Sequence, residues 1–139
     1  MSLLKLKLKP GEPIFDQIVF AATKAFVSGE YASGQAFPSV RTLAAELRIH
    51  PNTAQKIIQH LIREGFLEAL PGVGTVVSDL PAAPPGNRRK LLKDQVTALV
   101  VEALRIGASS SEVHSAIDET WQDLSPIEEI QRETLAKNR

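Results

Sequence analysis

No cysteine occurs among the 139 residues of the sequence, and no long apolar run does either. The missing thiols exclude a disulfide framework, a thiolate metal site and a cysteine nucleophile. The apolar runs fall short of the roughly 18 residues that a membrane span requires. The first residues, Met1 to Lys7, also lack the uninterrupted apolar core of a signal peptide. We therefore expect a cytoplasmic protein without a membrane partner.

A net charge is lacking as well, because sixteen Lys and Arg residues balance sixteen Asp and Glu residues. Dividing the chain changes little: residues 1–79 carry eight basic and seven acidic side chains, and residues 80–139 carry eight and nine. Bulk charge therefore does not predict a nucleic-acid partner. Any such case depends on where individual side chains lie.

Signals for an enzyme are weak. His50, His60 and His114 do not have the spacing of metal ligands. Gly72-Val73-Gly74 precedes a strand-like run, whereas a dinucleotide site needs a helix at that point. We therefore predict no catalytic residue, no metal and no cofactor.

Two patterns of different period predict a strand followed by a helix at the start of the chain. Leucines alternate with lysines over residues 4–8, a period of two that predicts a short half-buried strand with a solvated lysine face. Apolar residues then recur at helical spacing over 14–27, with Pro13 suited to a first-turn position. Ser28-Gly29 can end that helix, and a loop over 29–38 follows.

A short helix, a tight turn and a third helix come next. Ser39 can cap the short helix, whose buried stripe ends at Leu47. Arg48-Ile49-His50 forms the turn, and Pro51 fits the first position of the third helix, because its missing N–H would be unpaired there. That helix has an apolar stripe and an opposite polar face. The stripe is Ala54, Ile57, Ile58, Leu61 and Ile62, and the polar face is Asn52, Thr53, Gln55, Lys56, Gln59 and Arg63.

Gly65 ends the third helix, and a hairpin is expected behind it. Strand-like runs over 66–70 and 75–78 flank Pro71-Gly72-Val73-Gly74, whose glycines supply the unusual backbone angles of a tight turn. Residues 80–87 contain three prolines, which predicts a stiffened linker.

A helical tail over residues 88–139 follows the linker. Its first helix is expected to stop at Gly107, and Ser109 with Glu112 forms a capping box for a second. The sequence Ser125-Pro126-Ile127-Glu128 repeats this capping-box pattern and predicts a last helix.

The order of these elements predicts an α/β, mostly helical fold, with a winged helix-turn-helix domain over 1–79, a linker over 80–87 and a small helical dimerisation tail over 88–139. The N-terminal end of the third helix is the part that usually reaches base edges. Asn and Gln can bond adenine through two hydrogen bonds, and Thr can meet a thymine methyl or a phosphate. A merely solvated helix face is the alternative, and face polarity alone does not decide between them.

The residues also resemble the GntR family of bacterial transcription regulators over about residues 4–78. Five motifs carry the resemblance, in order and spacing: Pro13-Ile-Phe-Asp-Gln-Ile, Gly34-Gln-Ala-Phe-Pro-Ser-Val-Arg-Thr-Leu-Ala, Asn52-Thr-Ala-Gln-Lys, Leu61-Ile-Arg-Glu-Gly-Phe-Leu and Gly72-Val-Gly-Thr-Val-Val. The short tail and the Pro51-Asn52-Thr53 start of the third helix look like the YtrA subfamily. That resemblance implies a small homodimeric repressor of a kind that often controls transporter operons.

Site residues implied by the resemblance are named only where the motifs match. Two departures stand out: His50-Pro51 replaces a Ser-Arg pair, which removes a hydroxyl cap and a positive contact, and Val40 replaces a frequent glutamate. The implied DNA-binding residues are Ser39, Arg41 and Thr42 at the second helix, Asn52, Thr53, Gln55 and Lys56 at the third, and Gly72, Gly74 and Thr75 at the wing tip.

Arg41 is also supported independently of the family. A guanidinium in the first turn of a helix can bond a phosphate or a guanine, and Ser39 can donate to a phosphate beside the same helix end. A surface ion pair of Arg41 with Glu46 or Glu12 is the alternative.

The tail is too short to enclose a usual metabolite cavity, so its apolar stripes must face something else. Winged-helix operators are generally read by two-fold dimers. We expect packing across the two-fold axis, with Trp121 as the main anchor; the alternative is a tryptophan packed on its own winged helix. The expected interface is Leu92, Val96, Leu99, Val100, Ala103, Val113, Ile117 and Trp121.

The sequence therefore predicts a dimeric repressor that binds double-stranded DNA at a palindromic operator. Lys56, Arg41 and Arg63 are expected at phosphates, and Gln55 and Asn52 at bases. A winged helix that binds another protein instead of DNA is the alternative, supported by the near-zero charge of residues 1–79. The sequence identifies no small-molecule effector.

Overall fold

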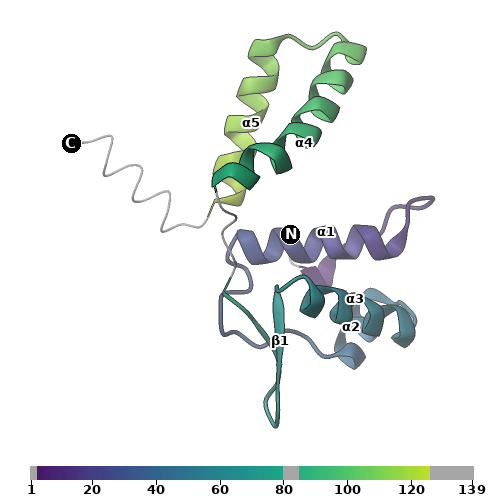
Figure 1. Ribbon diagram of the computed structural model, residues 1–139. Helices are drawn as coiled ribbons and strands as arrows, with labels where there is room; N and C mark the ends of the chain where they lie inside the picture. The colour runs from purple at the N-terminus through teal and green to yellow at the C-terminus, as the bar shows by residue number, and fades with distance from the viewer. Residues whose placement is uncertain (1–2, 80–84, 126–139) are drawn as a thin grey trace. The chain divides into compact units, whose positions relative to one another are not determined.

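The computed structural model describes residues 3–79 and 85–125 (Figure 1). The chain divides into two units, residues 1–80 and 81–139. Over the described residues, the first unit contains a short 3-10 helix, three α-helices and a two-stranded sheet, and the second contains two helices. In order, they are η1 (Leu3–Lys5), α1 (Ile14–Val27), α2 (Val40–Leu47), α3 (Pro51–Arg63), β1 (Leu67–Leu70), β2 (Gly74–Val77), α4 (Pro85–Ile106) and α5 (Ser110–Leu124).

One hydrophobic core holds the first unit together. Each of its three α-helices contributes a buried stripe, as the periodicity predicts. Ile14 and Ile62 are the exceptions, because each is at least a third exposed at the end of its stripe. The buried helical residues are Ile18, Ala22, Ala25 and Phe26 in α1, Leu43, Ala44 and Leu47 in α2, and Ala54, Ile57, Ile58 and Leu61 in α3.

The turn between α2 and α3 depends on a left-handed residue. Arg48 has φ 54° and ψ 48°, a conformation that costs most side chains energy. The Arg48 N–H donates to the Ala44 carbonyl oxygen, and the Ile49 N–H donates to the same oxygen at 3.1 Å. The chain thereby leaves α2 and starts α3 within three residues, which confirms the predicted helix-turn-helix.

The predicted hairpin is present as the antiparallel pair β1–β2, with Leu67 opposite Val77 and Leu70 opposite Gly74. The loop before α2 pairs with the other edge of β2. There the Phe37 N–H donates to the Thr75 carbonyl oxygen at 2.9 Å, and Ala36 forms a bridge with Val76. Figure 1 shows the hairpin extending from the helices with its turn at the far end. The fold is therefore a winged helix.

An aromatic cluster joins α1 to the base of this wing. The Phe26 ring lies 5.5 Å from the Phe66 ring and 5.6 Å from the Phe37 ring, measured between centroids. Tyr31 extends the cluster at 5.4 Å from Phe37. Pairs of this geometry stabilise the folded state by about 0.5–1.5 kcal/mol beyond the contribution of their burial. The loop before α2 is therefore held both by these ring contacts and by its hydrogen bond to β2.

The strand predicted over residues 4–8 is wrong. Residues 3–5 form η1, and the following residues pair with no strand. The three leucines of residues 4–8 are half-buried against the helical core, and the lysines between them are exposed. The alternation of leucine and lysine therefore reflects alternate burial in a segment that is not a strand. Side chains accept the hydrogen bonds of backbone N–H groups in this segment. The Glu30 carboxylate accepts from the Leu3 N–H, and the Gln17 side-chain oxygen accepts from the Lys9 N–H.

Over residues 87–125, the second unit has almost no core of its own. Its chain reverses after Gly107, where the Ala108 N–H donates to the Ala103 carbonyl oxygen at 2.9 Å, and α5 returns toward the level at which α4 began (Figure 1). The capping box predicted from Ser109 and Glu112 is present. Among residues 87–125, Ala103 is the one buried hydrophobic residue.

Two expectations for the C-terminal half need comment. Residues 85–87, predicted as the end of the linker, belong to α4 instead, because a proline is well accommodated at the first position of a helix. The helix predicted from Ser125-Pro126-Ile127-Glu128 lies outside the described residues. Within the described ranges, no helix is long and apolar enough to cross a membrane.

Ile57→Ala tests the α3 packing, because Ile57 is fully buried. We expect the free energy of unfolding to fall by about 2–5 kcal/mol, from the lost burial and the cavity left behind. Ile62→Ala, the same change on the same helix at a partly exposed side chain, should cost about 1 kcal/mol or less. Urea unfolding followed by circular dichroism measures both, and equal losses would contradict the assigned faces.

Candidate nucleic-acid interface

The N-terminal half of α3 presents polar side chains on the side opposite its buried stripe. Asn52, Gln55 and Lys56 are exposed and Thr53 is half-buried. Gln59 and Arg63 continue this face toward the end of the helix. Burial of Ala54, Ile57, Ile58 and Leu61 fixes the helix by its other face, so the polar side chains cannot rotate into the core.

His50 caps the start of this helix, a role that the sequence did not indicate. Its ring nitrogen Nδ1 accepts a hydrogen bond from the Asn52 N–H at 3.0 Å. The hydroxyl cap is absent as expected, but the helix is capped nonetheless, because an imidazole nitrogen supplies the acceptor that a serine hydroxyl would have supplied. A histidine is an uncommon cap, and residue preference alone does not predict it.

Ser39, Arg41 and Thr42 form the exposed start of α2. The Ser39 hydroxyl accepts from the Thr42 N–H at 3.1 Å and donates to Thr42 Oγ1 at 3.1 Å. The predicted cap is thus confirmed, and the Thr42 hydroxyl proton remains available to an outside acceptor. Arg41 forms no ion pair within the described part of the chain, so the expected alternative of a pair with Glu46 or Glu12 is not present.

The wing tip is the third set of candidate residues. Gly72 and Gly74 have φ of 75° and 106°, so the turn requires glycine at both positions. Thr75 is half-buried at the start of β2. Val73, between the glycines, is 68% exposed and was missed by the sequence analysis, although its place at the hairpin tip could have indicated it.

A backbone hydrogen bond links two of these three sets. The Phe37 N–H donates to the Thr75 carbonyl oxygen, which places the chain two residues before Ser39 against the strand that starts at Gly74. The α2 start and the wing are therefore parts of one rigid arrangement.

Charge is distributed unevenly over the first unit, although its total is near zero. Residues 39–63 carry four cations, Arg41, Arg48, Lys56 and Arg63, against the single acid Glu46. All four cations are exposed, and none forms an ion pair within residues 3–79. The acids that balance the total lie mainly outside the helix-turn-helix. The bulk-charge argument against a nucleic acid therefore does not apply to this surface.

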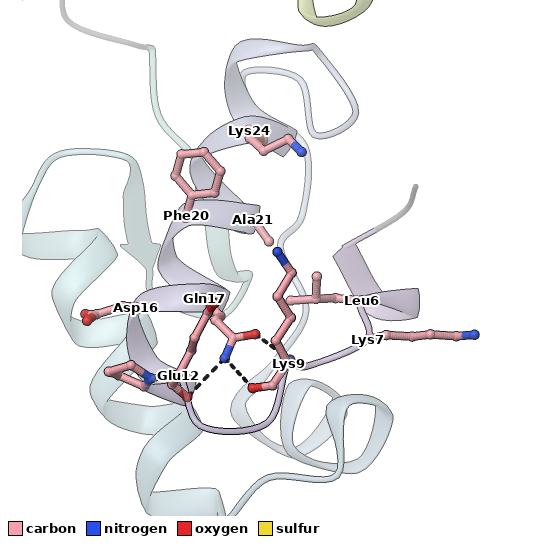
Figure 2. A pocket seen from close by; sticks show the side chains of 10 residues that line it. Leu6, Lys7, Lys9, Glu12, Asp16, Gln17, Phe20, Ala21 and Lys24 are labelled. Carbon is pink, nitrogen blue, oxygen red and sulfur yellow. Dashed lines mark hydrogen bonds between the residues drawn. The ribbon is translucent and has the colours of Figure 1, made fainter. Parts of the chain in front are cut away.

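A second candidate site is an open hollow of about 520 Å³ between the N-terminal segment and α1. Figure 2 shows the Gln17 amide at its edge, where its nitrogen donates to the carbonyl oxygens of Lys9 and Glu12. Lys7 and Asp16 point away from one another, so the polar groups do not converge on one point as they do in a ligand site. The Gln17 bonds instead hold the N-terminal segment on α1. No group of side chains in the described ranges could hold a metal ion.

The tail residues predicted for dimerisation differ in exposure. Ala103 is buried and Val113 is half-buried, both near the reversal between α4 and α5. The other six are exposed, from 42% at Val100 to 61% at Trp121. Leu91, Val101, Leu104 and Ile106 are exposed apolar residues that the sequence analysis left out of the set.

Comparison with known proteins finds a similarity to one family over part of the chain. Residues 16–77 match the family described as bacterial regulatory proteins, gntR family. The HTH-type transcriptional repressor YtrA of Bacillus subtilis (strain 168) is 28% identical over 123 residues, covering 88% of this chain and 95% of that protein.

Solved structures of other proteins share the fold of this chain. A transcriptional antiterminator from Listeria monocytogenes EGD-e superposes with a TM-score of 0.72 and 25% identity, covering 86% of this chain and 90% of that one. A GntR family transcriptional regulator from Listeria monocytogenes shares the fold, with a TM-score of 0.62 and 21% identity over 81% of this chain and 98% of that one. Residues 16–77 of this chain thus match the gntR family of bacterial regulatory proteins, and the winged helix-turn-helix fold of the first unit is similar to that of solved transcriptional regulators.

Proposed function

We propose that the chain is a homodimeric repressor that binds a palindromic operator and occludes a promoter. The observation that carries the proposal is the exposed polar face of α3, with unpaired cations and the wing on the same unit. The N-terminal residues 1–79 would bind DNA, and the tail that begins with α4 at Pro85 would dimerise. From the resemblance to the YtrA-like subfamily, we place a transporter operon among its targets. A DNA partner puts the protein in the cytoplasm.

Each set of side chains has a distinct role in this proposal. Asn52 and Gln55 contact base edges in the major groove, because their amides can donate and accept at adenine. Lys56, Arg41 and Arg63 contact phosphates, which fix the position of the helix without reading sequence. Thr53 contacts a thymine methyl or a phosphate, Ser39 and Thr42 meet a phosphate beside α2, and Gly72, Gly74 and Thr75 border the minor groove.

Dimerisation is supported by the exposed apolar surface of the tail. A monomer rarely leaves so many large apolar side chains in water without a partner. The proposed interface is Leu92, Val96, Leu99, Val100, Ala103, Val113, Ile117 and Trp121, and a two-fold dimer would present two α3 helices to two half-sites.

Arg41→Ala tests the phosphate contacts. Selection from a random DNA pool first supplies the operator, and binding is then measured over a range of salt concentrations. Loss of one phosphate contact should weaken binding and lower the salt slope by about one unit for each copy bound. Lys24→Ala removes an exposed cation from α1 and should leave the slope unchanged. A protein-binding winged helix would show no salt-dependent DNA retention at all.

Gln55→Ala tests base reading. We expect discrimination at one base pair of each half-site to weaken by about 1–3 kcal/mol, because a base-edge contact is lost. Gln59→Ala is the matched control, since Gln59 is exposed on the same face one turn farther from the helix start. Competition with single-base operator variants measures the effect, and an unchanged sequence preference in Gln55→Ala would remove that residue from the interface.

Trp121→Ala tests the dimer. Loss of a large buried anchor should raise the dimer dissociation constant by about 30-fold or more, measured by sedimentation over a range of concentrations. Gln122→Ala, at the exposed neighbouring position, should leave the dimer unchanged. A wild-type concentration dependence for Trp121→Ala would overturn the assigned interface.

A further inference from the structure

His50 is the residue before α3, and both its backbone and its ring are fixed at the start of that helix. Its φ of −64° and ψ of 140° are extended, as expected for a residue that precedes a proline. The His50 carbonyl oxygen accepts a hydrogen bond from the Ala54 N–H at 3.1 Å, and the ring nitrogen Nδ1 accepts from the Asn52 N–H at 3.0 Å. The side chain is nevertheless exposed. The ring therefore lies in one place at the end of the helix that carries the candidate base-reading residues.

The bond from Asn52 determines which ring nitrogen of His50 carries the hydrogen. A backbone N–H can only donate, so Nδ1 has no hydrogen of its own. In a neutral imidazole the hydrogen then lies on Nε2. A ring turned by half a rotation would bring a carbon to the Asn52 N–H and leave that donor without an acceptor. His50 therefore presents an Nε2–H donor beside the start of α3.

This donor is not used within the described part of the chain. No hydrogen bond, ring contact or ion pair engages the Nε2 side of the ring there. The single acid of residues 39–63, Glu46, forms no bond to it. Arg41 and Lys56 have no acceptor atoms in their charged groups. The Nε2–H is therefore open to an acceptor from outside the chain.

We propose that the His50 Nε2–H donates to a phosphate oxygen of the DNA backbone while Nδ1 keeps its bond to Asn52. This inference rests on the proposed DNA binding and adds a positioning residue to it. Phosphate and sugar oxygens take most of the hydrogen bonds that proteins donate to DNA, and the positive end of the α3 dipole favours an anion at this place. One ring then both caps the helix and holds its start against the DNA backbone.

A proton–nitrogen NMR correlation spectrum of the full chain tests the ring assignment. At about pH 8 an ordinary histidine is neutral, and His50, identified by the signal lost in His50→Asn, should carry its hydrogen on Nε2. His114 provides a contrast in the same spectrum. Its Nδ1 lies 2.7 Å from the Ser110 carbonyl oxygen, which can only accept, so its hydrogen should lie on Nδ1. A hydrogen on Nδ1 of His50 would overturn the proposal.

Two amide variants separate the cap from the phosphate contact. In His50→Asn, the side-chain oxygen takes the place of Nδ1 and can cap the helix, but the place of Nε2 stays empty. In His50→Gln, the longer side chain brings an amide N–H to the place of Nε2, and the place of Nδ1 stays empty. Each variant is the matched control for the other.

We expect the two variants to change different properties. His50→Asn should keep the midpoint of urea unfolding and weaken operator binding by about tenfold for each copy bound, because a hydrogen bond to a charged acceptor is lost. His50→Gln should lower the urea midpoint by about 0.5 M, because the cap is lost, and should keep most of the operator affinity. The opposite pattern would overturn the proposal.

The salt dependence of binding tests whether the donor is neutral. An uncharged N–H neutralises no phosphate, so the salt slope of His50→Asn should equal that of the wild type. A slope lower by about one unit would show a cation at residue 50 and contradict the neutral contact. A changed base preference in His50→Asn would assign the donor to a base and contradict the phosphate contact.

The same titrations distinguish this inference from the proposed function. If the wild type binds its operator and His50→Asn binds equally well, the His50 contact is wrong and the proposed function stands. If the wild type shows no salt-dependent DNA binding, both are wrong.

Discussion

Burial of one face of α3 is the constraint on which the rest of the molecule depends. Four apolar side chains of that helix pack into the core, and α2 and β1 both pack beside it. Because this face cannot leave the core without a cost of several kcal/mol, the opposite face has one orientation toward solvent. The position of the polar residues Asn52 to Lys56 is thus a consequence of hydrophobic packing, and their chemistry is free to differ among proteins that share the fold.

The wing and the start of α2 depend on the same core through the loop between α1 and α2. Phe37 packs in the aromatic cluster while its N–H binds β2, so one residue joins a side-chain contact to a backbone contact. Such a double attachment limits the motion of Arg41 relative to Thr75. In the proposed complex, a surface assembled in this way would lose little conformational freedom on binding.

The helices, their order and the hairpin could be predicted from the sequence, because each depends on local periodicity and on glycine or proline at its ends. The sequence wrongly predicted a strand over residues 4–8. A period of two shows that alternate side chains are buried, but it does not show whether the backbone pairs with a strand. The His50 cap was missed because it depends on a ring orientation. The candidate DNA-binding residues could be predicted from the sequence motifs. The lack of ion pairs at the cations of residues 39–63 and the exposure of Val73 could be seen only in the structure. The net charge of residues 1–79 did not predict a nucleic-acid partner, because it sums the charges over all faces of the unit.

The scarcity of buried apolar residues over 87–125 of the tail has a consequence for the proposed function. Helices that bury little by themselves gain stability from association, so their order increases with the amount of protein present. In the proposed dimer, mass action would link abundance to activity: the DNA-binding pair would form only above a threshold concentration, and dilution after cell division would dissociate it. With Ala103 as the one buried hydrophobic residue of the described tail, the proposed dimer would make DNA binding depend on the number of copies in the cell.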